Sequence, residues 1–232
     1  MFDFPGYTFT DQLHEGRNTL VVRARRKSDD EAVILKALIK RNPDPHEAVQ
    51  LHHEYDMLKL LEDVSGVVEA CSVERALGIH ALVLKDQGGT SLRSLIKASR
   101  KELDLFFTVA LGLTTVLKSV HDTDILHKDI NPNNILFLPE TKSVSLIDFG
   151  SATRLSRSQA VPLNPALIEG TLAYIAPEQT GRMNRSIDYR SDYYALGITL
   201  YELLLGIQPF RSSDPMEQIH SHIAQKPVPP HV

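Results

Sequence analysis

The stretch His-Lys-Asp-Ile-Asn-Pro-Asn-Asn, residues 127–134, is the most informative part of this 232-residue chain. Downstream lies Asp-Phe-Gly at 148–150, so a carboxylate, an amide and a second carboxylate follow one another at defined spacing. Asp129 can accept the proton of an attacking hydroxyl, while Asn134 and Asp148 offer the oxygen ligands that Mg²⁺ prefers. Because Mg²⁺ takes only one or two carboxylates from a protein and completes its shell with phosphates, this pattern predicts a phosphoryl-transfer site.

The composition is that of a globular chain, with 42% hydrophobic and 23% charged residues. Its length allows one large domain or two lobes, each with its own core. The net charge of −4 gives no general attraction to nucleic acid, so no nucleic-acid partner is expected. Cys71 is the only cysteine, which excludes an internal disulfide and suits a reducing cytoplasm, where we expect the protein to act.

The longest apolar stretch, residues 193–207, is interrupted by Glu202 and is too short to span a bilayer. We therefore expect a buried core helix there and no membrane segment. The N-terminus has no charged-then-apolar secretory pattern.

Alternating hydrophobicity in the first part of the chain is typical of strands. The expected strands are 7–13, 20–26, 32–38, 67–73 and 80–84. Asp44-Pro45-His46-Glu47 is typical of a helix start, and the helix that it predicts carries Glu54. A short polar connector follows at 85–89.

The second part reads as mainly helical. Helices are expected at 103–120, at 192–205 and after Asp214-Pro215, with short strands at 135–137 and 144–147. Gly206 and Pro209 end the second of these helices.

The motifs, taken together in their order along the chain, are stronger evidence for a protein family than any one of them alone. A lysine ends the apolar run Val33-Ile34-Leu35-Lys36, Glu54 follows on a helix, and Ala-Pro-Glu at 176–178 comes after the two motifs described above. With this order the chain resembles the eukaryotic-type protein kinase family over nearly its whole length. The resemblance implies a bilobal α+β fold with an N-lobe at 1–84, a hinge at 85–89 and a C-lobe at 90–232 that lacks its last helices.

The resemblance also implies roles for residues, with ATP and Mg²⁺ as cofactors. Lys36, oriented by Glu54, would hold the ATP phosphates, and Asp129 would deprotonate a protein hydroxyl. The residues implied to carry catalysis are Lys36, Glu54, Asp129 and Asn131, and the implied Mg²⁺ ligands are Asn134 and Asp148. The residues implied to line the nucleotide site are Leu13, Gly16, Val21, Ile34, Lys36, Leu84, Lys85, Gln87, Leu136 and Asp148.

The segment Gly170–Glu178 looks like the part of a protein kinase that docks the protein substrate. Thr171, together with Pro132 in the loop, points to serine or threonine substrates. Asp192 matches the buried aspartate that braces the catalytic loop in this family.

Within the protein kinase family, the sequence resembles one bacterial group in particular. The run 177–185, followed by Asp188–Asp192, is similar to large signalling multikinases that join a Ser/Thr kinase domain to an ATPase-like module, a sensor and a histidine kinase. The resemblance therefore implies signal transduction and further domains in a longer chain.

Three positions depart from the family pattern. The nucleotide loop keeps only its middle glycine, since His14, Gly16 and Thr19 occupy the three places. Asn131 stands where a lysine is usual, and losing such a preorganised donor can cost about 10²–10³ in rate. Lys128 replaces an arginine and has no bidentate fork. We therefore expect a weak dependence on phosphorylation of the loop hydroxyls, Ser156, Ser158 and Thr171.

Two other functions remain open at this point. A pseudokinase that only binds nucleotide would explain the degenerate loop and Asn131, although Lys36, Asp129 and Asp148 argue for catalysis. A small-molecule phosphotransferase would share the Asp-Asn-Asp site, although it would not need the docking segment at 170–178.

Overall fold

The computed structural model describes residues 3–16, 18–39, 45–98, 102–155, 171–183 and 185–230. They divide into two compact units, one of Met1–Asp63 and Val67–Gly88, the other of Val64–Gly66 and Gly89–Val232. The division falls within the connector expected at 85–89. Gly88 and Gly89 both have positive φ, and a Cβ on Gly89 would lie 2.7 Å from the Phe137 carbonyl oxygen, so that position requires glycine.

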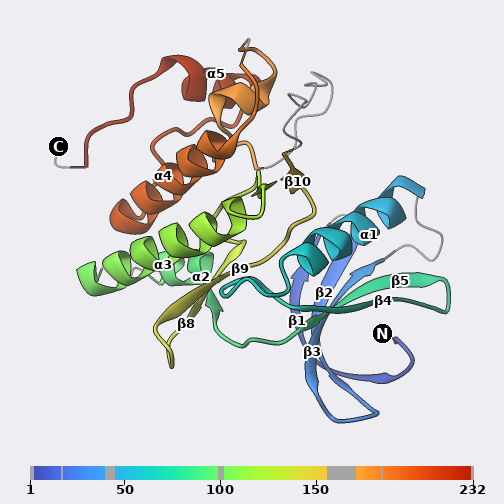
Figure 1. The fold of residues 1–232 in the computed structure, drawn as a ribbon. Coiled ribbons are helices and arrows are strands. Elements are labelled where there is room, and N and C mark those ends of the chain that lie inside the picture. The colour runs from blue at the N-terminus through green and yellow to red at the C-terminus, as the bar shows by residue number, and fades with distance from the viewer. Residues whose placement is uncertain are drawn as a thin grey trace. The chain divides into compact units, whose positions relative to one another are not determined.

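The first unit is a five-stranded antiparallel sheet with one helix, as Figure 1 shows. Its strands, in the order β1-β2-β3-β5-β4, are β1 Tyr7–Glu15, β2 Thr19–Arg26, β3 Ala32–Leu38, β4 Ala70–Ala76 and β5 Ile79–Lys85. The helix α1, Pro45–Leu60, contacts β4 and β5. Every expected strand is present, although β4 begins at Ala70 rather than at Val67.

The core of this unit follows from the alternation of its strands. In β2 and β3 every second side chain is buried, which places Leu20, Val22, Val33 and Leu35 in one apolar cluster. The residues between them, including Lys36, therefore lie on the other face of the sheet.

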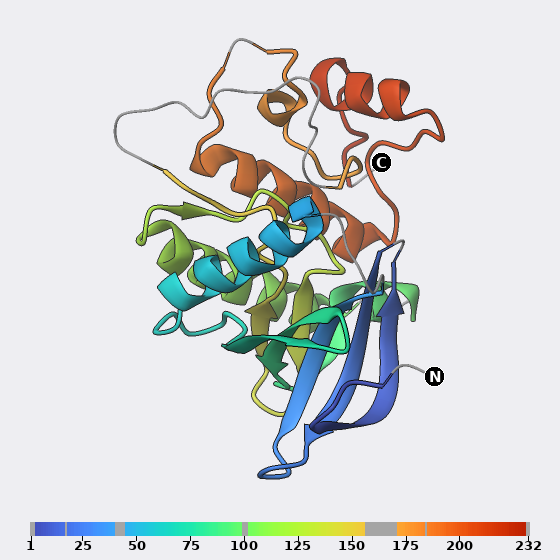
Figure 2. The same ribbon diagram turned by 90° about the vertical axis from the view of Figure 1, so that its right-hand side faces the viewer.

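The second unit is mainly helical (Figure 1). Its helices are α2 Leu92–Lys97, α3 Leu103–His121, α4 Tyr189–Leu205 and α5 Pro215–Ala224, with a 3-10 turn, η1, at Pro177–Thr180. Its short strands are β6 Thr90–Ser91, β7 Ile125–Leu126, β8 Ile135–Leu138, β9 Ser143–Leu146 and β10 Thr153–Arg154. They form a β6-β8-β9 sheet and a β10-β7 pair. Figure 2 shows α5, in red, beside the orange η1 turn, in agreement with the contacts between them.

Two helix starts differ from the expected ones. Helix α4 begins at Tyr189, three positions before Asp192, because the Asp188 side chain accepts from the Arg190 N–H at 2.9 Å and caps it. Helix α2 was not expected, because six residues are too few to show a period; Ser91 caps it through the Ser94 N–H. Asp44, expected to cap α1, lies outside the described residues.

Helix α3 is the helix that bears on the question of a membrane segment. Among the described residues it alone is long and apolar enough to cross a bilayer, a test that core helices of folded domains also pass. Val109, Leu113, Leu117 and Val120 are buried on one face, and the helix contacts β9 and α4. The buried core helix expected in the stretch 193–207 is confirmed, because residues 193–205 form the last part of α4.

Candidate active site

The loop between β7 and β8 holds the Asp129 carboxylate between two donors. Its Oδ1 accepts from the Thr171 N–H at 2.8 Å, and its Oδ2 accepts from Asn134 Nδ2 at 2.9 Å. Asn134 Nδ2 also donates to the Asp129 carbonyl oxygen at 2.9 Å. Both amide hydrogens of Asn134 are thus used, which leaves its Oδ1 as an acceptor turned away from Asp129.

Asp148 is brought to the same place by the backbone. The Ile147 N–H donates to the Asn134 carbonyl oxygen at 3.0 Å, so the residue before Asp148 is tied to the other expected metal ligand. Asp148 has φ of 64°, a left-handed conformation that is costly for a residue with a Cβ. The next residue, Phe149, is fully buried, and its ring centroid lies 4.5 Å from that of His127. An amide oxygen and a carboxylate in this setting suit Mg²⁺.

Asp192, a residue of α4, holds the backbone of the loop between β7 and β8 in place. This carboxylate is 1% exposed and accepts from the His127 N–H at 2.9 Å, the Lys128 N–H at 2.8 Å and His121 Nε2 at 2.8 Å. Three donors compensate for the burial of its charge. His121, at the end of α3, was missed by the sequence analysis because nothing in its spacing relates it to Asp192.

Asn131 is a positioning residue in this structure. It is 1% exposed, and its Nδ2 donates to the Asp129 carbonyl oxygen at 3.1 Å and to Thr171 Oγ1 at 3.3 Å. Its Oδ1 accepts from the backbone N–H and from Nδ2 of Asn133. Asn131 therefore fastens the catalytic loop to the segment that carries Thr171, and it supplies no charge of its own.

The first unit carries the expected phosphate-binding pair. Lys36 Nζ lies 2.7 Å from Glu54 Oε2, with the Glu54 side chain 3% exposed. Val21 is opposite Lys36 in the β2–β3 ladder and Ile34 is opposite Leu84 in the β3–β5 ladder, so these four side chains share one face of the sheet.

The other residues expected to line the nucleotide site differ in their exposure and in their hydrogen bonds. Leu13 is 47% exposed and falls at a register shift in β1, while Gly16 closes the β1–β2 turn through its N–H and the Thr19 carbonyl oxygen. The Lys85 N–H donates to the Glu69 carbonyl oxygen at 2.9 Å, so only the Lys85 carbonyl could face an adenine. The Gln87 side chain donates to the Val67 carbonyl oxygen. Leu136 is half-buried in β8 of the second unit.

A buried polar network lies beside the segment that follows Thr171. Glu202 of α4 is 4% exposed and forms an ion pair with Arg93 of α2 at 2.6 Å. The Tyr174 hydroxyl donates to Glu202 at 2.5 Å, and Arg93 and Gln208 donate to that hydroxyl. Burial, reinforced by the hydrogen bond to Glu202, raises the pKa of Tyr174 to about 12. The sequence showed Glu202 only as an interruption of an apolar run.

Some expectations fall outside what the structure describes. Ser156, Ser158 and Gly170 belong to residues 156–170, and Asn184 belongs to the run similar to the multikinases. The docking segment is described only from Thr171 onwards.

A small antiparallel sheet with one helix, followed by a mainly helical unit with this loop, defines the protein-kinase-like class, and the expected α+β fold is confirmed. The family model of the protein kinase domain matches residues 7–230, so the chain belongs to the protein kinase family.

Relatives with curated names agree with this assignment. A probable serine/threonine-protein kinase of Corynebacterium efficiens is 30% identical over 169 residues, covering 72% of this chain and 25% of that protein. A probable serine/threonine-protein kinase of Clostridium perfringens is 28% identical over 226 residues, covering 97% and 32%. The serine/threonine-protein kinase PknB of Mycobacterium leprae is 27% identical over 238 residues, covering 98% and 36%. The chain thus spans between a quarter and about a third of these relatives, and it is a protein serine/threonine kinase domain by family.

A prediction concerns the ion pair of the first unit. Glu54→Gln is expected to lower the free energy of unfolding by about 1–2 kcal/mol, because the Lys36 ammonium then donates to a neutral amide oxygen instead of a carboxylate and the ion pair is lost. Glu69→Gln is the matched control, since its pair with Lys85 is about half exposed, at 55% and 48%, and is worth under about 1 kcal/mol. Denaturant unfolding of both variants measures the difference; equal losses would contradict the assignment.

Proposed function

We propose that this domain transfers the γ-phosphate of ATP, bound with Mg²⁺, to a serine or threonine hydroxyl of a protein. The observation that carries the proposal is the Asp129 carboxylate, held between the Thr171 N–H and the Asn134 amide in a loop braced by Asp192. A carboxylate fixed in this way can orient a hydroxyl and accept its proton as the new bond forms. The position of Thr171 supports a protein as the substrate. Thr171 is bonded to Asp129, and the residues that follow it, 172–178, belong to the segment expected to dock a protein substrate.

The metal would be held by Asn134 and Asp148. When bound, Mg²⁺ neutralises charge on the phosphates. The geometry of both residues fits metal binding. The Nδ2 group of Asn134 donates both of its hydrogens to Asp129, so its Oδ1 is the atom that could bind Mg²⁺. A backbone hydrogen bond from Ile147 to Asn134 holds the neighbouring Asp148 close to it. Lys36, paired with Glu54, supplies a positive charge for the other phosphates.

A second candidate is nucleotide binding without transfer. It is favoured by Asn131, whose polar atoms are all engaged within the protein and which adds no positive charge. In that case ATP with Mg²⁺ would stabilise the domain against heat, but no protein would be phosphorylated.

We further propose that the domain acts in the cytoplasm, in bacterial signal transduction, as part of a longer chain. The supports are the similarity of residues 177–192 to signalling multikinases and the single cysteine. The sequence of the gene on either side of this segment tests the proposal, and a neighbouring region with no sensor or histidine kinase would count against it.

The test of the activity is phosphate transfer from labelled ATP to generic protein substrates. We expect incorporation that stops when EDTA removes Mg²⁺ and returns when Mg²⁺ is restored. Asp148→Asn should raise the Mg²⁺ concentration for half-maximal transfer about tenfold, because a charged contact worth about 1.4 kcal/mol is lost. Asp124→Asn is the control, since Asp124 also has positive φ, of 60°. Incorporation that persists in EDTA would overturn the metal assignment.

A further inference from the structure

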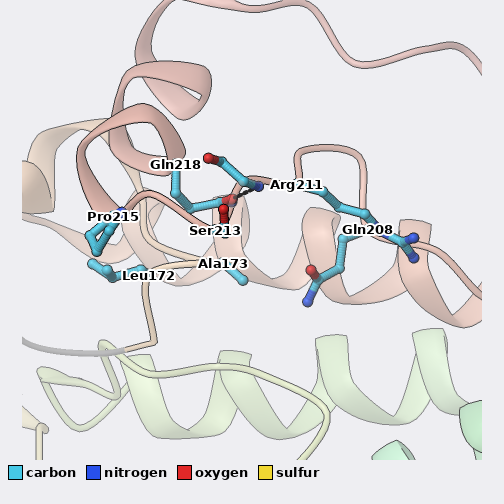
Figure 3. Close-up of a pocket in the computed structure, with 8 residues that line it drawn as sticks. Leu172, Ala173, Gln208, Arg211, Ser213, Pro215 and Gln218 are labelled. Atoms are coloured by element: carbon cyan, nitrogen blue, oxygen red, sulfur yellow. Dashed lines mark hydrogen bonds between the residues drawn. The ribbon is translucent and has the colours of Figure 1, made fainter.

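A cavity of about 570 Å³ opens in the second unit next to the catalytic loop (Figure 3). One wall is Leu172 and Ala173, which directly follow Thr171, the residue bonded to Asp129. The other wall comes from residues 208–218, between α4 and the first turn of α5. A chain with its hydroxyl at Asp129 would therefore reach this cavity with a nearby residue.

The walls of the cavity are held by buried hydrogen bonds. Gln208 donates to the Tyr174 hydroxyl at 2.9 Å, and Tyr174 is anchored on Glu202. Gln218, 6% exposed, accepts from the Ser212 N–H at 2.8 Å and donates to the Phe210 carbonyl oxygen at 3.3 Å. Such a cavity is formed before a ligand arrives, which lowers the entropy cost of binding.

The cavity has two chemically different ends. Figure 3 shows Leu172 and Pro215 toward one end and the side chains of Gln208 and Arg211 toward the other. Arg211 is the one charged residue among the described residues that line it. Within the part of the chain that the structure describes, no side chain pairs with the Arg211 guanidinium.

The neighbouring carboxylates do not cancel this charge. Glu202 is neutralised by Arg93. Asp214 accepts from the Glu217 N–H and caps α5, while Glu217 accepts from the Ser212 hydroxyl, and neither of them lines the cavity. As far as the described residues go, the cavity therefore presents the positive charge of Arg211 without a paired carboxylate to whatever enters it.

We infer that this cavity binds an acidic side chain of the protein substrate, an inference that rests on the proposed function. The guanidinium of Arg211 receives the carboxylate as a planar donor, and Leu172 and Pro215 pack against the methylene groups. An extended chain advances about 3.3–3.6 Å per residue. Because the cavity begins one residue from Thr171, the acidic residue lies within about three positions of the phosphorylated hydroxyl.

The test compares peptides that differ only by Glu or Lys at each position within three residues of a single serine. At one or more positions the wild-type chain is expected to prefer Glu by about three- to tenfold in kcat/KM, as for a charged contact at a partly exposed site. Arg211→Gln should remove the preference, and Arg211→Glu should reverse it. Arg75→Glu makes the same change in net charge at an exposed position of β4 in the other unit and should leave the preference intact.

A binding measurement separates this inference from the proposed function. In an Asp129→Asn background, the acidic peptide should bind more tightly than its lysine counterpart, and adding Arg211→Glu should invert the order. Phosphorylation without any charge preference overturns the inference and leaves the kinase activity standing. Charge-dependent binding without phosphorylation in the wild type overturns the activity and leaves the cavity assignment standing.

Discussion

Replacing Asp129 by asparagine is expected to lower the rate of phosphate transfer by about 10²–10⁴-fold, because the group that accepts the hydroxyl proton is lost. The variant should still fold, since Asp192, and not Asp129, holds the backbone of the loop. One of the two oxygens of residue 129 becomes an NH₂ group, which faces a donor from Thr171 or Asn134. A loss of about 1–3 kcal/mol in the free energy of unfolding should accompany the change.

The control for this variant is Asp122→Asn. Asp122 follows α3, and its pair with Lys118 is exposed, at 62% and 72%. We expect wild-type transfer from it, since exposed pairs contribute little to stability. Initial rates with labelled ATP, corrected for the folded fraction, give the comparison. Transfer by Asp129→Asn within a factor of two or so of the control would refute the role of Asp129 as base.

The second large effect concerns stability. Arg93→Met is expected to lower the free energy of unfolding by about 3–5 kcal/mol, because it leaves the carboxylate of Glu202 buried without its cation. Burial works against the charged form of Arg93, but the hydrogen bonds and charges of Glu202 and Tyr174 together outweigh it and raise the Arg93 pKa. Arg93 is therefore charged in the folded domain.

Two further variants make this measurement specific. Adding Glu202→Gln to Arg93→Met should restore part of the lost stability, because the buried charge disappears with its partner. Arg190→Met is the exposed control, since its nearest approach to Asp188 is 3.9 Å and its side chain is 73% exposed. Urea unfolding of the wild type, Arg93→Met, Glu202→Gln and the double variant gives the coupling energy, and a loss below about 1 kcal/mol for Arg93→Met would show that the pair is not structural.

The sequence predicted those parts of the fold that depend on local pattern. Alternation predicted the strand 32–38 that carries Lys36, and Gly206 marked the end of α4, where it has φ of 73°. It also placed Asp129, Asn134 and Asp148 in one loop system, because the motif spacing fixes them there.

What the sequence did not reveal was which distant polar groups meet. Arg93 and Glu202 are 109 positions apart, and His121 and Asp192 are 71 apart. Each of these side chains looks ordinary in its own segment, and only packing of α2 and α3 against α4 brings the pairs together. Asn131 was expected among the catalytic residues for a similar reason: its position in the motif was visible, but its contact with Thr171 was not.

The engagement of Asn131 also limits which residue can replace it. Asn131 supports Asn133 and Thr171 through three separate hydrogen bonds in a space that is 1% exposed. A lysine at this position would remove those contacts and bring an ammonium group into a buried position. The residue at 131 is therefore interdependent with its partners at 133 and 171, and we expect Asn131→Lys to be tolerated only together with changes at those positions.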